Sequence, residues 1–150
     1  KDQKPSVTPI RSGTGSPVQG GPLLSRDIRF LFMPNSSDLD LSNENNLKDL
    51  ASIKKMLQIS PGSMVLLPGH VDNAKIAEFR KQGGEAFVRA QALKAMELSK
   101  ARAGEIGRIL VEKYGIDAAR IEKTGRGWDE PLGTDSDQNR RVEVQWFTLE

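Results

Sequence analysis

Three separated stretches decide the fold of this chain: Gly69-His70-Val71-Asp72-Asn73, Leu98-Ser99-Lys100-Ala101-Arg102-Ala103 and Asn139-Arg140-Arg141-Val142. The first continues an apolar run, residues 64–67, that predicts a strand buried on both faces. The second lies in a helical region, and the third opens a strand. The stretches therefore place a carboxylate, Asp72, and two guanidinium groups, Arg102 and Arg140, on three different elements. Groups of both charges suit the binding of a small zwitterion rather than the breaking of a bond.

The composition indicates one ordinary domain. The chain has 150 residues, which is enough to bury a single core. Its 22 basic and 20 acidic side chains nearly balance, so no strongly charged partner is indicated. The absence of cysteine excludes a disulfide framework and a thiolate metal site. No apolar run approaches the roughly 20 residues of a membrane span, and no signal-peptide core is found. Because the chain begins at Lys1, we expect a processed or excised piece.

The N-terminal segment differs from the rest. Residues 1–26 contain four Gly, four Pro and four Ser, with few large apolar side chains. Such a segment cannot bury enough apolar surface to offset its ordering entropy. The sequence therefore predicts a flexible linker over 1–26, tethering a domain over 27–150 to something upstream.

The hydrophobic spacing of residues 27–150 predicts alternating strands and helices. Alternation of Ile28, Phe30 and Phe32 predicts a first strand, and Ser42 is the expected N-cap of a helix that ends at 60–62. After the strand at 64–67, a helical region over 74–113 is interrupted at 83–84, and 121–124 form a third strand. A last strand places the apolar side chains of Val142, Val144 and Trp146 on one face.

The resulting order, β-α-β-α-β-β, predicts an α+β fold. We expect a two-layer sandwich in which a mixed four-stranded sheet carries helices on one face. Residues 75–113 carry nine basic and five acidic side chains. An ordinary solvated helix face accounts for that excess, so no nucleic-acid partner is expected.

Each candidate site residue also has a structural interpretation. Asp72, where a strand enters a loop, either binds a ligand or caps the next helix, and both interpretations stay open. Arg102 either binds a carboxylate with two hydrogen bonds from its planar guanidinium group or is a solvated charge on the helix surface. At the start of the last strand, an arginine either binds a ligand or protects the sheet edge against aggregation, and the second interpretation is favoured for Arg141 but not for Arg140.

An enzyme is not expected. His70 is the only histidine and follows an apolar strand, which is more typical of a structural role, and no nucleophile motif accompanies it and Asp72. Residues 135–139 begin like a calcium loop, but Arg140 and Trp146 stand where such a loop needs Gly and Glu, so no metal site is expected.

Together the three stretches resemble the OmpA-like peptidoglycan-binding domain, a family that includes the peptidoglycan-associated lipoprotein and the C-terminal part of the flagellar stator B subunit. The resemblance runs from about residue 27 to residue 149. Besides the opening stretches it rests on these matching residues: Phe30, Leu31, Phe32, Asn35, Leu39, Tyr114, Gly115, Ile116, Arg120, Ile121, Gly125, Pro131, Glu143 and Val144.

The resemblance implies a non-catalytic module without a cofactor that binds the stem peptide of peptidoglycan. In the family, the Asp after the Gly-His pair and the Arg of the Leu-Ser motif hold diaminopimelate. Those positions are Asp72, for the ammonium group, and Arg102, for a carboxylate. Asn35, Asn73 and Arg140 match positions near the ligand. The implied location is the periplasm of a Gram-negative bacterium, at the cell wall, with a tether to the outer membrane or to a larger envelope protein.

The chain departs from the family pattern in several places. Val71 replaces the usual Thr, Met33 stands where Asp is frequent, Ala74-Lys75 replaces a Thr-Gly turn, and Ala95 replaces an Asn. Arg102 follows Asp72 by 30 positions, which is more than the family spacing and implies a helical insert at about 74–97. The departures leave an alternative open: a protein-interaction or regulatory module of a periplasmic or outer-membrane protein, for example fused to a solute-binding protein, with altered or lost wall binding.

Overall fold

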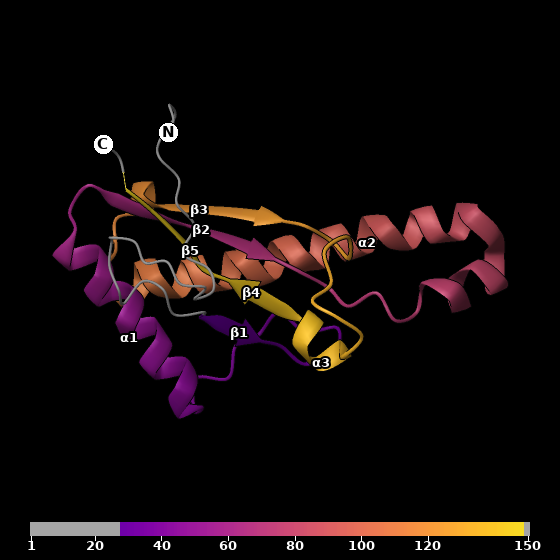
Figure 1. The fold of residues 1–150 in the computed structure, drawn as a ribbon, viewed down its shortest axis with the longest axis horizontal. Coiled ribbons are helices and arrows are strands. Elements are labelled where there is room, and N and C mark those ends of the chain that lie inside the picture. Colours follow the sequence, from indigo (N-terminus) through magenta and orange to yellow (C-terminus); the bar gives the residue numbers. More distant parts are fainter. Residues whose placement is uncertain (1–27, 149–150) are drawn as a thin grey trace.

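The computed structural model describes residues 28–148, so the linker predicted over 1–26 lies outside the described residues. The elements, in chain order, are β1 (Arg29–Leu31), α1 (Glu44–Ile59), β2 (Ser63–Gly69), α2 (Ile76–Glu112), a 3-10 turn (Ala118–Arg120), β3 (Ile121–Gly125), α3 (Ser136–Asn139), β4 (Arg141–Glu143) and β5 (Gln145–Thr148) (Figure 1). None of the helices within 28–148 is both long and apolar enough to span a membrane.

One mixed sheet forms the centre of the molecule. β1 pairs antiparallel with β4, and β2 pairs parallel with β3. β4 and β5 both pair antiparallel with β2, and only Val144 separates them in the chain. The predicted mixed sheet is therefore confirmed, except that the last strand is broken at Val144 into two, which gives five strands rather than four.

The helices supply most of the remaining core. α2 packs against β2, β3 and β4, and α1 contributes Leu50, Ile53 and Leu57, which are fully buried. The expected N-cap is wrong by one residue. Asn43 caps α1 by accepting from the Asn46 amide at 3.0 Å, whereas Ser42 donates its hydroxyl to Asp40 at 2.6 Å.

β2 is buried mainly on the side that faces α2. Val65 and Leu67 are fully buried, while Met64 and Leu66 on the opposite face are half-buried. The prediction of burial on both faces was wrong at these two positions. It followed from the unbroken apolar run, which does not show how much the second face is covered.

α2 approaches the sheet closely at two glycines. A Cβ on Gly69 would lie 2.1 Å from the backbone oxygen of Ser99, and a Cβ on Gly125 would lie 2.7 Å from the Ser99 hydroxyl oxygen. Ser99 itself is fully buried, and its hydroxyl accepts from the Gly127 amide at 2.9 Å. These contacts fix the height of α2 above β2 and β3, and so the position of Arg102 one turn further along.

The predicted helical insert is present as the first part of α2. The helix is kinked at Gly83 and Gly84, and Gly84 has a φ of 72°, which favours glycine. Figure 1 shows this part of α2 projecting beyond the end of the sheet and turning back on itself. Phe79 joins the insert to the body, because its ring lies 5.7 Å from the ring of Phe87 and 6.1 Å from that of Trp128.

Candidate functional site

Arg102 is the organising side chain at the end of the sheet where β2 and β4 meet. It is fully buried, and it donates three hydrogen bonds to backbone oxygens. Nε donates to Ser36 at 2.8 Å, Nη1 to His70 at 2.9 Å and Nη2 to Met33 at 3.0 Å. The guanidinium also lies 5.5 Å from the centre of the Phe32 ring. One side chain therefore ties the loop after β1 to the loop after β2.

The charge of Arg102 is retained despite its burial. Loss of solvation lowers its pKa to about 10, with a smaller contribution from the positive charge of Arg140 and an opposing one from Asp72. A guanidinium has five N–H donors. The three hydrogen bonds leave one N–H on each terminal nitrogen for a further acceptor.

Asp72 lies beside this buried charge and is half-buried. Its Oδ1 accepts from the Ala74 amide at 2.7 Å and from the Ser136 hydroxyl at 3.0 Å. The carboxylate thus closes a turn ahead of α2 and contacts α3, but it does not cap α2, whose N-cap position is Lys75. Both bonds use Oδ1, and neither uses Oδ2.

Arg140 holds the same loop from the other side. Its Nε donates to the Phe32 oxygen at 2.9 Å, and its Nη2 forms an ion pair with Asp137. The Arg140 amide donates to the Ser136 oxygen at 3.2 Å. The guanidinium is thereby fixed between β1 and α3, with 13% of the side chain exposed.

The two predicted asparagines lie on the loops that these arginines hold. Asn35 is exposed, with a φ of 58°, in a turn closed by a hydrogen bond from the Ser36 amide to the Met33 oxygen. Asn73 is half-buried next to Asp72, and its carbonyl accepts from the Ile76 amide. The structure therefore brings Asp72, Arg102 and the two loops to one end of the sheet.

Sequence reasoning missed the contribution of α3. Ser136 bonds Asp72 and Asp137 pairs with Arg140, so α3 forms one wall of the site. The sequence did carry a signal, because aspartate is a preferred residue at the start of a helix, and Asp135 indeed accepts from the amide two residues later.

The arrangement defines a class of module in which loops at one end of a mixed sheet carry a carboxylate and two guanidinium groups. Arg102 and Arg140 both donate to the segment after β1, and Asp72 and Arg140 both contact α3. The model of the OmpA family matches residues 31–145, and the chain belongs to this family.

Three similar proteins illustrate the relationship. Outer membrane protein Omp38 of Acinetobacter baumannii is 27% identical over 79% of this chain. The cell wall anchor of the T6SS from Pseudomonas aeruginosa is 31% identical, with a TM-score of 0.55, over 83% of this chain and 80% of that one. The peptidoglycan-associated lipoprotein from Burkholderia pseudomallei is 21% identical and shows the fold, with a TM-score of 0.62 over 82% of this chain and 92% of that one.

The chain spans about 30% of the length of the curated relatives that it matches. OmpA-like domains bind peptidoglycan and anchor envelope proteins, and they are structural rather than catalytic. Omp38 is an outer membrane protein, and the periplasmic domain of Helicobacter pylori MotB shares the fold, with a TM-score of 0.58.

Proposed function

We propose that this chain binds the peptidoglycan stem peptide at its diaminopimelate residue and anchors a larger periplasmic or outer-membrane protein to the cell wall. The observation that carries the proposal is the half-buried Asp72 carboxylate beside the buried Arg102 guanidinium, with Oδ2 unused by the two bonds that hold it. Diaminopimelate presents ammonium and carboxylate groups on one short chain, which matches this pair of charges. A 31% identical relative is itself a cell wall anchor, which supports the same role here.

The residues take different parts in this proposal. Asp72 accepts from the ligand ammonium group through Oδ2. Arg102 offers a ligand carboxylate its two remaining N–H groups, and this contact requires a shift of the loop at residues 33–36, because Arg102 is fully buried. Arg140 is partly exposed and adds positive charge beside that carboxylate. Asn35 and Asn73 supply amide groups from the two loops.

The expected affinity of one domain is modest. Each partly exposed ion pair with the ligand contributes about 0.2–1 kcal/mol. An anchor tolerates this weakness, because a larger assembly that carries several such domains meets many stem peptides at a high effective concentration. The proposed tether to an upstream envelope domain serves that purpose.

The test is sedimentation of the chain with purified sacculi. Asn keeps the hydrogen bonds to Ala74 and Ser136 while removing the charge, so we expect Asp72→Asn to pellet about two- to fivefold less at limiting sacculus. Asp117→Asn is a matched control, because Asp117 accepts from the amide two residues later in the same way, at 3.0 Å, but lies before β3. It should pellet like the unmodified chain.

Equal pelleting of Asp72→Asn and the unmodified chain would contradict the proposed contact between Asp72 and the ligand ammonium group. Titration with free diaminopimelate gives a second readout, in which NMR shifts should concentrate on residues 33–36 and 70–73. If the unmodified chain neither pellets nor shifts, the protein-interaction alternative is favoured instead.

A further inference from the structure

A second polar cluster lies on the other face of the sheet. Gly69 and Val142 point toward α2, as the contact of Gly69 with Ser99 and the full burial of Val142 show. Because side chains alternate along a strand, the adjacent His70 and Arg141 point to the opposite face. Each is only 2% exposed there. Their side chains therefore leave the sheet on the face opposite α2.

The cluster contains buried nitrogens without partners among residues 28–148. These are both ring nitrogens of His70, Nη1 of Arg141 and Nε of Arg126, which follows β3. Buried polar groups in proteins are nearly always hydrogen-bonded, and leaving them unpaired is costly. Four such nitrogens on three neighbouring side chains indicate an acceptor from beyond residues 28–148.

The backbone holds the three side chains in place. The His70 amide donates to the Arg141 oxygen at 2.8 Å, and the Arg126 amide donates to the Gly69 oxygen at 2.9 Å. Both arginines also contact Glu130, Arg141 through the backbone oxygen at 2.9 Å and Arg126 through the carboxylate at 3.7 Å. The cluster is therefore preorganised, which lowers the cost of binding a ligand.

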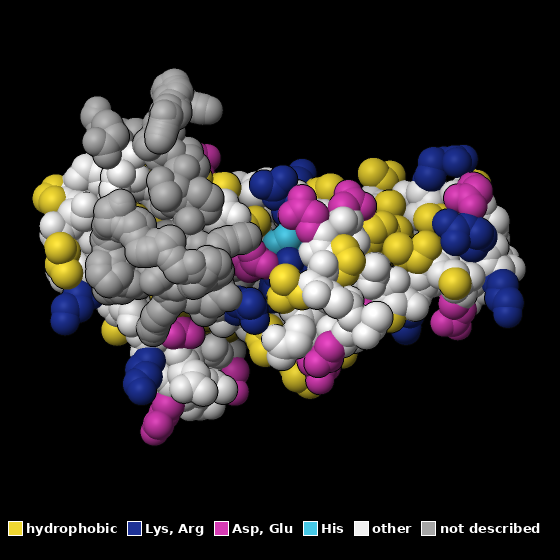
Figure 2. All heavy atoms as spheres, in the orientation of Figure 1, with side chains coloured by type: hydrophobic (Ala, Val, Ile, Leu, Met, Phe, Trp, Pro, Cys, Tyr) yellow, Lys and Arg dark blue, Asp and Glu magenta, His cyan; other side chains and the backbone are white. Residues whose placement is uncertain are grey.

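The cluster is buried but lies close to exposed side chains. The side chain of Arg126 is 40% exposed, and Leu31, the cross-strand partner of Arg141, is 42% exposed. Figure 2 shows the cyan histidine side chain in a hollow bordered by acidic and basic side chains. A small ligand would reach the unpaired nitrogens, which are themselves buried, by displacing the exposed part of the Arg126 side chain.

We propose that His70, Arg126 and Arg141 form a binding site for a single carboxylate. The unpaired groups are mainly donors, which an oxyanion satisfies: two N–H on Arg141 Nη1, one on Arg126 Nε and one on the neutral imidazole. Glu143, which pairs with Arg141 at 2.6 Å, and Glu130 limit the charge that the site accepts. They disfavour a dianion such as phosphate and favour a monoanion.

Binding should be coupled to a proton on His70. Burial lowers the pKa of this histidine to about 4, helped by Arg141 and Arg126 and opposed by Glu143. Other charged side chains at this face are Glu130, Arg29, whose cross-strand partner is Glu143, and Glu122, whose cross-strand partner is Leu66. A bound carboxylate adds a negative charge beside the ring and raises its pKa. Carboxylate affinity therefore rises as the pH falls toward that pKa.

The experiment follows the ring signals of the single histidine by NMR during titration with sodium acetate. Sodium chloride and sodium phosphate at matched ionic strength are the comparison salts. We expect saturable shifts with acetate alone, and a higher apparent pKa of His70 at saturating acetate. Arg126→Gln, at a partly exposed position, should weaken acetate binding at least about fivefold. Glu130→Gln should strengthen it by up to about fivefold, because a repelling carboxylate is removed.

Equal shifts with acetate and chloride, or unchanged acetate binding in Arg126→Gln, would overturn the proposal and leave water as the partner of these nitrogens. Shifts with phosphate as large as those with acetate would overturn the preference for a monoanion. Sedimentation with sacculi should be unchanged in Arg126→Gln. The carboxylate site and the proposed wall binding can therefore fail independently.

Discussion

Replacement of Arg102 tests whether one buried side chain holds the two loops of the site together. Arg102→Met keeps much of the volume and the helix propensity but removes all three hydrogen bonds to backbone oxygens. A hydrogen bond to a charged group contributes about 1.5–3 kcal/mol. Water can replace the guanidinium at the partly buried Ser36 and Met33 oxygens, but not at the buried His70 oxygen. We therefore expect the free energy of unfolding to fall by about 2–4 kcal/mol, out of a total of about 5–15 kcal/mol.

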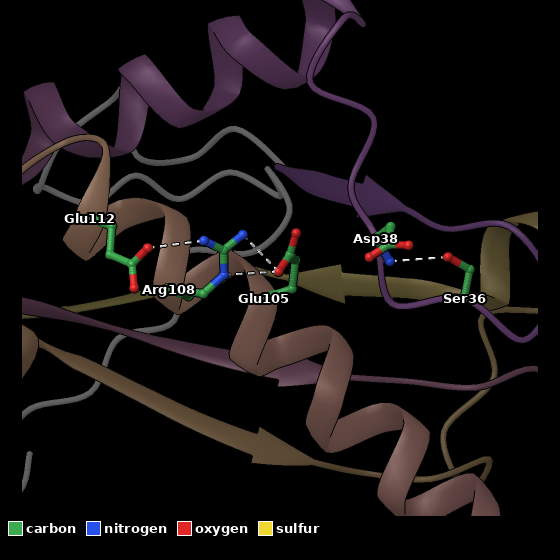
Figure 3. A network of polar contacts seen from close by, with 5 residues as sticks. All are labelled: Ser36, Asp38, Glu105, Arg108 and Glu112. Atoms are coloured by element: carbon green, nitrogen blue, oxygen red, sulfur yellow. Dashed lines mark hydrogen bonds and ion pairs between the residues drawn. The ribbon is translucent and has the colours of Figure 1, made fainter.

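The assay is urea unfolding with Arg108→Met as the matched control. Arg108 lies on the same helix but is 46% exposed, and its ion pairs within residues 28–148 are with Glu105 and Glu112. Figure 3 shows Arg108 between these two carboxylates, separate from the loop that carries Ser36 and Asp38. Its replacement should leave the midpoint nearly unchanged, because exposed ion pairs contribute little.

The two variants separate a positioning role from a general effect of removing a helix arginine. If Arg102→Met shifts the urea midpoint no more than Arg108→Met, the three carbonyl contacts do not stabilise the loops and the reasoning fails. Arg102→Lys provides a further point. A lysine retains the charge but cannot span the three oxygens with a planar fork, so it should recover only part of the loss.

Two further predictions concern stability. Gly69→Ala should destabilise the domain by about 3 kcal/mol or more, because its Cβ would meet a backbone oxygen 2.1 Å away that cannot rotate aside. Gly104→Ala is the control and should stabilise the domain by up to about 1 kcal/mol, because a Cβ there has nothing within 4 Å. Thermal unfolding compares the two variants, and equal midpoints would contradict the close approach of α2 to Gly69. Folding lowers the pKa of His70 from 6.5 to about 4, so the unfolded chain binds more protons than the folded chain between these pH values. Stability is therefore lost as the pH falls through that range, by roughly 2–3 kcal/mol. In denaturant titrations His70→Gln should lose less stability in acid, and an identical loss would show that the ring is not buried in its neutral form.

The order of elements was predictable because each segment carries its own periodicity. Phe30 and Phe32 alternate with exposed or partly exposed neighbours, and Ile106, Ile109 and Leu110 recur at helical spacing, so both patterns identify their buried faces. The break of the last strand at Val144 was not predictable in this way. The apolar alternation continues through it, and only the pairing of β2 with both β4 and β5 shows where the strand is interrupted.

The environment of Arg102 was also beyond the reach of spacing arguments. The sequence shows an arginine between two alanines, which fits a surface charge as well as a buried one. Its burial depends on carbonyl oxygens contributed by residues 33, 36 and 70, which are far away in the chain. A resemblance can name the residue, but the three acceptors come only from the tertiary arrangement.

The insert changes the surroundings of the site more than its centre. Its helical part begins four residues after Asp72, projects beyond the sheet, and is tied back by the contact of Phe79 with Trp128 (Figure 1). Arg102 nevertheless reaches the loops, because Gly69 sets the closeness of α2 to the sheet downstream of the kink at Gly83 and Gly84. The insertion is thus absorbed by a helical hairpin ahead of the contact. The chain length between Asp72 and Arg102 consequently does not determine the distance between their side chains, and the longer spacing is compatible with a clamp made of the two.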